Sequence, residues 1–240
     1  NVITARLKEW YGLHFPELTG LVDDPIGYAK IASAGTRDKI DENILSGMNL
    51  SPKKVEAMML AAKGSKGGSI SKEDAAMVAL LAETTMSLSA SKDRLQRYVE
   101  SSMRRLAPNM SAVAGETIGA RLIAKAGGLA RIAKLPSSTI QVLGAEKALF
   151  RALKTGSRPP KHGILFQHEH VHGAPKWQRG KIARSLASKI AIAARVDMFR
   201  GEKQEGIESK FAKRLEEIRE KYKEPPPEEP KRVFKPKFVP

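Results

Sequence analysis

The chain has 240 residues, 41% of them apolar, and a formal net charge of +16. This length can hold one or two domains with a substantial core. The absence of cysteine excludes disulfide frameworks, thiol catalysis and cysteine-ligated zinc, and it fits a reducing or hot cellular environment. No apolar run reaches the roughly 18 residues of a transmembrane helix, and the first ten residues lack a signal-peptide pattern, so we expect no membrane partner and a cytoplasmic location.

The N-terminal third predicts one helix followed by several short ones. Apolar residues recur at helical spacing up to Pro16, which stops the pattern. Asn1 already lies within this pattern without an initiator Met, so we expect a further N-terminal part before it. Residues 19–68 are broken by Gly, Pro and Asp, which predicts short helices joined by turns. Ser51 and Ser71 are predicted N-caps, the second with Asp74 in an imperfect capping box.

A long helix is predicted from Ser71 to Leu106, because this stretch contains no Gly or Pro and keeps a heptad spacing. Thr85, Lys92 and Ser102 interrupt the apolar seam, which favours an antiparallel or intramolecular coiled coil, with the first helix as a candidate partner. A helix buried in an ordinary bundle is the alternative. As coiled-coil contacts for self-association we select Val78, Leu81, Leu88, Leu95 and Val99.

After Pro108 and Asn109 the sequence predicts a second, helical domain. Ser111 to Ala126 is predicted as one helix that Gly127 and Gly128 close. Further helices are predicted at 129–135, 137–143, 145–154 and 176–200. A separate amphipathic helix is expected after Gly201; because residues 201–224 hold seven acidic and seven basic residues, we interpret it as a packing element that does not bind polyanions. The last residues, 225–240, form a proline-rich basic tail.

The stretch Gly144 to Gly163, GAEKALFRALKTGSRPPKHG, carries the strongest functional signal. A helix here would anchor through Leu149 and Leu153, while Lys147, Arg151 and Lys154 would line a cationic stripe. Gly156 would end the helix in a left-handed conformation, and two prolines would stiffen the loop that follows. A solvated helix and loop is the alternative for these residues taken alone.

The charge of the surrounding segment favours a polyanion partner. Between Arg121 and Arg184 the chain has thirteen Lys and Arg residues against Glu146 and Glu169, a net charge of +11. Solubility alone needs much less charge, so we expect a nucleic acid to bind this segment.

No catalytic or cofactor motif is present, so we predict that the chain is not an enzyme and has no cofactor. The HEHVH segment would place three imidazoles on one side if it were extended, which suits a metal ion. Only Glu169 lies nearby as a carboxylate, so surface or packed imidazoles are the favoured interpretation, and we predict no metal site.

Two stretches carry a family resemblance: GETIGARLIAKAGGLARIAKLPSSTIQVLGAEKALFRALKTGSRPPKHGILFQ, and later KWQRGKIARSLASKIAIAARVD. They closely resemble the Nop domain family, and within it the archaeal Nop5 scaffolds of box C/D small ribonucleoproteins. KEWYGLHFPEL, at Lys8 to Leu18, extends the resemblance over the coiled-coil region. The spliceosomal Nop-domain relative is usually richer in cysteine and lacks the GAEKALFR form, so it stays a second candidate. A coiled-coil structural protein with a basic solubilising domain is the alternative from another class.

The resemblance implies an all-α protein that dimerises through its coiled coil and takes part in guided 2'-O-methylation during rRNA and tRNA processing. Its Nop domain would grip a kink-turn of box C/D guide RNA jointly with a ribosomal-protein-like kink-turn-binding protein. Fibrillarin would bind an N-terminal domain that precedes Asn1. In a eukaryote the location would be nucleolar. The expected domains are 1–106 (coiled coil with a short-helix insertion), 107–201 (Nop domain), 202–224 (amphipathic helix) and 225–240 (tail).

Candidate site residues follow from the cationic segment and from the resemblance, which singles out Lys134 and His162 as RNA contacts. The candidates for RNA binding are Lys134, Lys147, Arg151, Lys154, Arg158, Lys161, His162, Lys176 and Arg179. The candidates for binding the protein partner are Glu146, Ala148, Phe150 and Gln167.

Overall fold

In a computed structural model, residues 2–48 and 50–226 are described, and they form helices and turns without a strand. The predicted all-α fold is confirmed. The chain divides into two compact units, residues 1–95 and 96–240, and each has its own hydrophobic core. The four-part domain division stays a prediction, and all of the predicted tail except 225 and 226 lies outside the described residues. Within the described ranges, no helix is both long and apolar enough to span a membrane.

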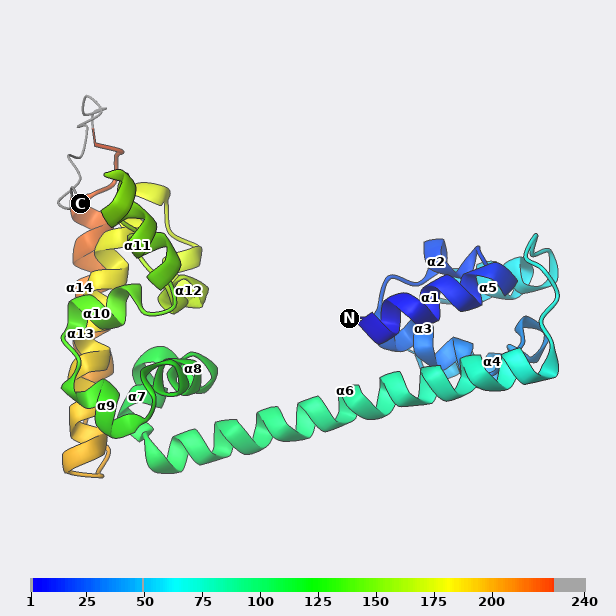
Figure 1. The fold of residues 1–240 in the computed structure, drawn as a ribbon, viewed down its shortest axis with the longest axis horizontal. Helices are drawn as coiled ribbons and strands as arrows, with labels where there is room; N and C mark the ends of the chain where they lie inside the picture. Colours follow the sequence, from blue (N-terminus) through cyan, green and yellow to red (C-terminus); the bar gives the residue numbers. More distant parts are fainter. Residues whose placement is uncertain (1, 49, 227–240) are drawn as a thin grey trace. The chain divides into compact units, whose positions relative to one another are not determined.

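The first unit confirms a leading helix followed by short ones (Figure 1). Its core is centred on aromatic rings, with Tyr11 and Tyr28 fully buried and in edge contact at 6.2 Å. The helices are α1 (Val2–His14), α2 (Leu18–Leu21), α3 (Pro25–Ala32), η1 (Arg37–Lys39), α4 (Glu42–Ser46), α5 (Pro52–Lys63) and the first part of α6 (Lys72–Leu106).

Helix α6 begins at the predicted cap. The Ser71 hydroxyl accepts a hydrogen bond from the Asp74 backbone N–H at 3.0 Å and donates to the Asp74 carboxylate at 2.6 Å. The N-terminal part of its heptad seam packs inside the first unit, where Val78 is buried and Leu81 lies against the core. Farther along, Leu88 and Leu95 are 52% and 65% exposed. The N-terminal part of the seam is therefore covered by the core of the first unit, and the part from Leu88 onward is uncovered.

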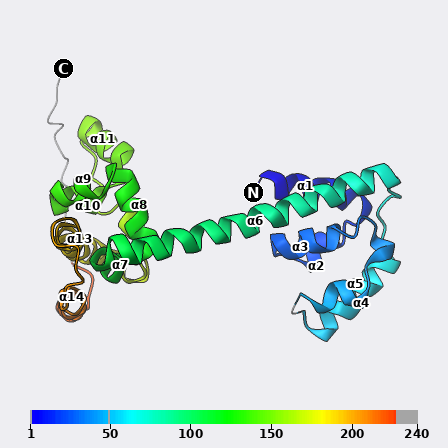
Figure 2. The same cartoon turned by 90° about the horizontal axis from the view of Figure 1, so that it is seen from below.

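The second unit is built around α13 (Lys176–Phe199). Against α13 pack α7 (Pro108–Ala114), α9 (Leu129–Lys134), α10 (Ser137–Val142), α12 (Glu169–His172) and α14 (Ile207–Lys221) (Figures 1 and 2). The apolar face of α13, with Ile182, Leu186 and Ile190, is fully buried. The other elements of this unit are α8 (Glu116–Ala126), α11 (Glu146–Thr155) and η2 (Ile164–Gln167).

One helix prediction is wrong: residues 111–126 do not form a single helix. Gly115 has φ +75°, a conformation that ends α7 and lets α8 start at the next residue in a new direction. A glycine inside a helical apolar pattern usually costs only some stability, so the periodicity alone concealed this break.

Helix α7 is capped from another helix. Ala107, its N-cap residue, has no side chain that can cap. The buried Asp197 carboxylate, near the end of α13, instead accepts from the Asn109 and Met110 backbone N–H groups at 2.9 and 2.8 Å and from Asn109 Nδ2 at 2.7 Å. A carboxylate at a helix N-terminus satisfies free donors and complements the helix dipole.

Helix α14 is a packing element, as predicted. Ile207, Phe211, Leu215 and Ile218 recur every three or four residues and are buried in the same core as α13. Burying four large apolar side chains stabilises the unit by several kcal/mol, at about 1.5 to 3 kcal/mol each.

Candidate nucleic-acid interface

The stretch Gly144 to Gly163 begins and ends at neighbouring positions beside the core of the second unit. Its end is held by backbone hydrogen bonds from Gly163 N–H to the Gln141 carbonyl, at 3.0 Å, and from Ile164 N–H to the Leu143 carbonyl, at 2.8 Å. The Gln141 side chain also donates to the Lys161 carbonyl at 2.7 Å. We call residues 144–163 the excursion and these three bonds the clasp. The clasp fixes both ends of the excursion side by side.

Within the excursion, α11 carries the predicted cationic stripe. Lys147, Arg151 and Lys154 are exposed and recur at i, i+4 and i+7. Ala152 is the one buried residue of α11, so most of the helix surface is free for other molecules. Gly156 adopts the predicted left-handed conformation, with φ +66°, and ends the helix.

An apolar stripe runs beside the cationic one. Phe150 is 64% exposed and Leu153 43% exposed, and their i, i+3 spacing makes them neighbours on the helix. The expectation that Leu149 and Leu153 both anchor α11 is therefore wrong for Leu153, and only Leu149 is half-buried. The buried contact of α11 is made by Ala152, which is small. The larger apolar side chains of Phe150 and Leu153 therefore stay exposed to solvent.

The loop after α11 brings its basic residues against the start of α13. Arg158 and Lys161 are exposed, and the Lys161 methylene chain lies over Gly180, where a β-carbon would come within 3.3 Å of Lys161 Cδ. The His162 ring stacks on Phe166, with centroids 4.7 Å apart and planes at 13°. Partial burial, with the charges of Arg179 and Lys161, lowers the pKa of His162, so the imidazole is neutral near pH 7.

Three of the candidate residues already bond within the unit. Glu146 accepts from Gly144 N–H at 2.8 Å, which lowers the pKa of its carboxyl group, and pairs with Lys125 at 3.3 Å. Gln167 accepts a hydrogen bond from Arg121. Arg179 donates to the carbonyls of Ala174 and His172 at 2.8 and 3.0 Å, so it holds the end of α12 while only part of its surface is free.

The other candidates lie on the surface of the same unit. Lys134 ends α9, Lys176 begins α13, and both are exposed, as is Ala148 on α11. Sequence reasoning missed Arg121 and Lys125 as the residues that fix Gln167 and Glu146. These two interactions join α8 to residues more than twenty positions later in the chain, and no local sequence pattern indicates them.

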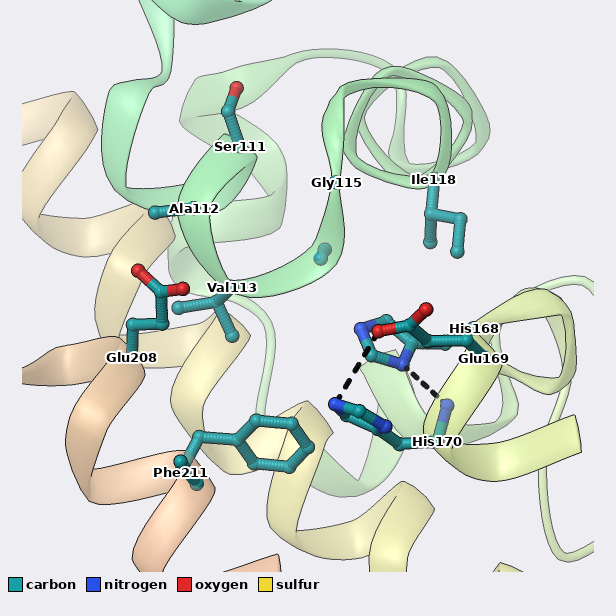
Figure 3. A pocket seen from close by; sticks show the side chains of 12 residues that line it. Ser111, Ala112, Val113, Gly115, Ile118, His168, Glu169, His170, Glu208 and Phe211 are labelled. Atoms are coloured by element: carbon teal, nitrogen blue, oxygen red, sulfur yellow. Dashed lines mark hydrogen bonds and ion pairs between the residues drawn. The ribbon is translucent and has the colours of Figure 1, made fainter. Parts of the chain in front are cut away.

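The histidine segment is helical and not extended: Glu169–His172 forms the single turn of α12, and His168 is its N-cap residue. His168 is buried, which lowers the pKa of its imidazole, and its Nδ1 accepts from His170 N–H at 3.3 Å. Both rings border a pocket of about 450 Å³ that Glu169, Glu208 and Phe211 also line (Figure 3). Across the described residues, no group of three or more potential ligands is arranged to hold a metal ion.

Comparison with known proteins bears on this surface. The family model described as "Nop: snoRNA binding domain, fibrillarin" matches residues 1–223. The chain belongs to the Nop family. This match covers both units, including the excursion and α13, so the resemblance of the GAEKALFRAL region to the Nop domain is confirmed.

Relatives of this Nop-family chain occur in archaea and in eukaryotes. A NOP5 family protein of Methanocaldococcus jannaschii is 45% identical over 227 residues, which are 94% of this chain and 54% of that protein. Nucleolar protein 58 of Candida albicans is 44% identical over 85% of this chain and 40% of its own length. The chain thus spans about half the length of these curated relatives, or less.

A solved structure has the same fold as this Nop-family chain. The crystal structure of a fibrillarin/Nop5p complex contains a chain that matches with a TM-score of 0.52 and 28% identity, over 91% of this chain and 75% of the other. The family description and the relatives' names refer to RNA binding, to fibrillarin and to the nucleolus, and none of them states a catalytic activity.

Proposed function

We propose that the chain is an RNA-binding scaffold of a box C/D ribonucleoprotein that guides RNA 2'-O-methylation. It would hold a kink-turn of the guide RNA jointly with a ribosomal-protein-like kink-turn-binding protein, and it would itself catalyse no reaction. The observation that carries this proposal is the surface of α11, where an exposed cationic stripe adjoins an exposed apolar stripe.

The two stripes suit two partners that adjoin each other. Lys147, Arg151 and Lys154 would meet RNA phosphates, whereas Phe150 would fill an apolar recess of the protein partner. A ten-residue helix is only about 15 Å long, so it contacts both partners only where they touch. Glu146 and Gln167 would contribute less to the protein contact than the sequence suggested, because each is already bonded within the unit.

His162 and the basic loop would extend the RNA contact beyond α11. Because one face of the His162 ring is stacked on Phe166, the ring is held in place before RNA arrives. A neutral imidazole can still hydrogen-bond a phosphate or a base edge. Lys134, Arg158, Lys161 and Lys176 would add phosphate contacts. Arg179 would contribute with the part of its surface that stays free while it holds the end of α12.

The first expected result concerns affinity. The chain alone should bind kink-turn RNA weakly and without sequence preference, and it should bind tightly when the kink-turn-binding protein is present. Replacing Lys147 and Arg151 with Gln should lower the slope of log affinity against log salt by about two units, since each phosphate contact contributes about 0.9. A gel-shift series over salt concentration measures both quantities. Equal affinity for the bare RNA and for the binary complex would contradict joint recognition.

Beyond RNA, we propose self-association and a link to fibrillarin. The names of the family and of the solved complex support a fibrillarin partner. For the location we propose the cytoplasm of an archaeal cell, supported by the NOP5 family relative, or the nucleolus if the source is eukaryotic.

The second expected result concerns the uncovered part of the α6 seam. Leu88, Leu95 and Val99 are exposed, so a second copy can cover them in a coiled coil. Leu88→Asp with Leu95→Asp would place charges in that contact and should shift the mass from dimer to monomer in light scattering. Ala90→Asp, also exposed but off the seam, is the control and should leave the mass unchanged. A monomeric parent chain at micromolar concentration would refute the assignment.

A further inference from the structure

A second basic surface lies between α13 and α14, and none of the candidate residues named so far lines it. The two helices pack side by side in the second unit (Figure 1) and border a groove of about 660 Å³. Six basic side chains line it against a single carboxylate, that of Glu217. The basic residues of this groove are Lys181, Arg184 and Lys189 from α13, and Lys210, Lys213 and Arg214 from α14.

The cations of both helices line the same groove. On α14, Lys210, Lys213 and Arg214 lie at i, i+3 and i+4, which is one side of a helix. The acidic Glu208 instead faces the pocket on the other flank. The equal numbers of acidic and basic residues in 201–224 therefore do not describe the groove side of α14, where three cations meet one carboxylate.

The groove has fixed walls. Both Trp177 Nε1 and Gln178 Nε2 donate to the carbonyl of Tyr222, at 2.9 and 2.8 Å, and so hold the end of α14 against the start of α13. The Lys181 ammonium group lies 4.2 Å from the centre of the Tyr222 ring. Glu217 is paired with Arg214 at 2.5 Å, so its charge is already balanced within the groove.

The groove and the excursion approach each other at the start of α13. The Lys161 methylene chain lies over Gly180, which directly precedes Lys181 of the groove. One extended polyanion could therefore follow both cationic surfaces, whereas a small anion would occupy only one.

We propose that the groove between α13 and α14 binds the phosphodiester backbone of RNA, as a second contact for the RNA held at the excursion. This inference rests on the proposed function. Residues 181 to 189 span about 12 Å of helix, a length along which an RNA strand presents several phosphates. Ser185 and Ser188 in the lining can donate to phosphate oxygens. A short acidic peptide would use the cations of the groove but would not reach the excursion as well.

The test compares two double variants with the same change of charge. Lys210→Gln with Lys213→Gln removes two cations of the groove. Lys203→Gln with Arg219→Gln removes two exposed cations that do not line it. With kink-turn RNA and the kink-turn-binding protein present, the groove variant should lower the salt slope by about 1.4 to 1.8 units, because each contact contributes about 0.7 to 0.9. Its affinity at low salt should fall about tenfold, with an unchanged melting temperature.

The outcomes separate this inference from the proposed function. If the Lys147→Gln, Arg151→Gln variant loses affinity while the groove variant matches its control, the groove does not bind RNA and the proposed function stands. If the parent chain binds no RNA even with the kink-turn-binding protein, both fail. Poly-glutamate serves as a competing probe: if the groove variant loses binding to poly-glutamate but not to RNA, the groove is a site for acidic protein segments and the inference is overturned.

Discussion

Replacing Asp197 with Ala is expected to lower the free energy of unfolding of the second unit by about 3 kcal/mol or more. The buried carboxylate accepts three hydrogen bonds from Asn109 and Met110. A hydrogen bond to a charged group contributes about 1.5 to 3 kcal/mol, and a buried donor left without a partner costs about as much. Asn109 also donates to the Glu202 carbonyl and accepts from Gln204 N–H, so its displacement would loosen the connection to α14 as well.

The two tryptophans allow the second unit to be measured by itself. Trp10 belongs to the first unit and is 55% exposed, whereas Trp177 belongs to the second and is bonded to Tyr222. In a Trp10→Phe background, fluorescence during urea unfolding reports on the second unit. Glu216→Ala, an exposed change on α14, should alter stability by less than about 0.5 kcal/mol. Asp197→Asn, which keeps one acceptor oxygen, should fall in between. A loss below about 1 kcal/mol for Asp197→Ala would show that the cap contributes little.

The sequence predicted those parts of the fold that are encoded locally. The Ser71 cap, the left-handed Gly156 and the apolar stripe of α14 each depend on residues within a few positions of one another. The break at Gly115 was missed because a single glycine in a periodic pattern can either continue a helix or end it. The backbone torsion angles of Gly115 depend on how α7 and α8 pack, and the spacing of apolar residues along the chain carries no information about that packing.

The candidate site was predictable to the same extent. The exposed cations of α11 follow from their spacing, but the internal bonds of Glu146, Gln167 and Arg179 do not. The first two of these side chains bond α8, which lies at least twenty residues earlier in the chain. The basic groove was missed for a related reason. The charge counted over residues 201–224 sums to zero, although Lys210, Lys213 and Arg214 of α14 line one groove together with three cations of α13.

Replacing Gly163 with Ala is expected to open the clasp that closes the excursion. A β-carbon at this position would lie 2.1 Å from the Leu143 carbonyl oxygen and 2.8 Å from that of Val142, and these are backbone atoms that cannot move aside cheaply. Both backbone bonds of the clasp would be lost, at about 1 kcal/mol each. Amide exchange at Ile164 should then accelerate about thirtyfold, since 1.4 kcal/mol corresponds to a factor of ten.

Opening the clasp should also weaken RNA binding, because the clasp fixes the position of α11 relative to the His162 loop. If RNA and its protein partner are bound jointly, affinity for the binary complex should fall about tenfold or more, while binding of bare RNA, which depends on charge alone, should change little. Gly12→Ala is the control, since nothing lies within 4 Å of its added β-carbon and a helical alanine is favoured. Faster exchange at Ile164 with unchanged affinity for the binary complex would mean that α11 and the loop bind independently, and the clasp would then serve stability alone.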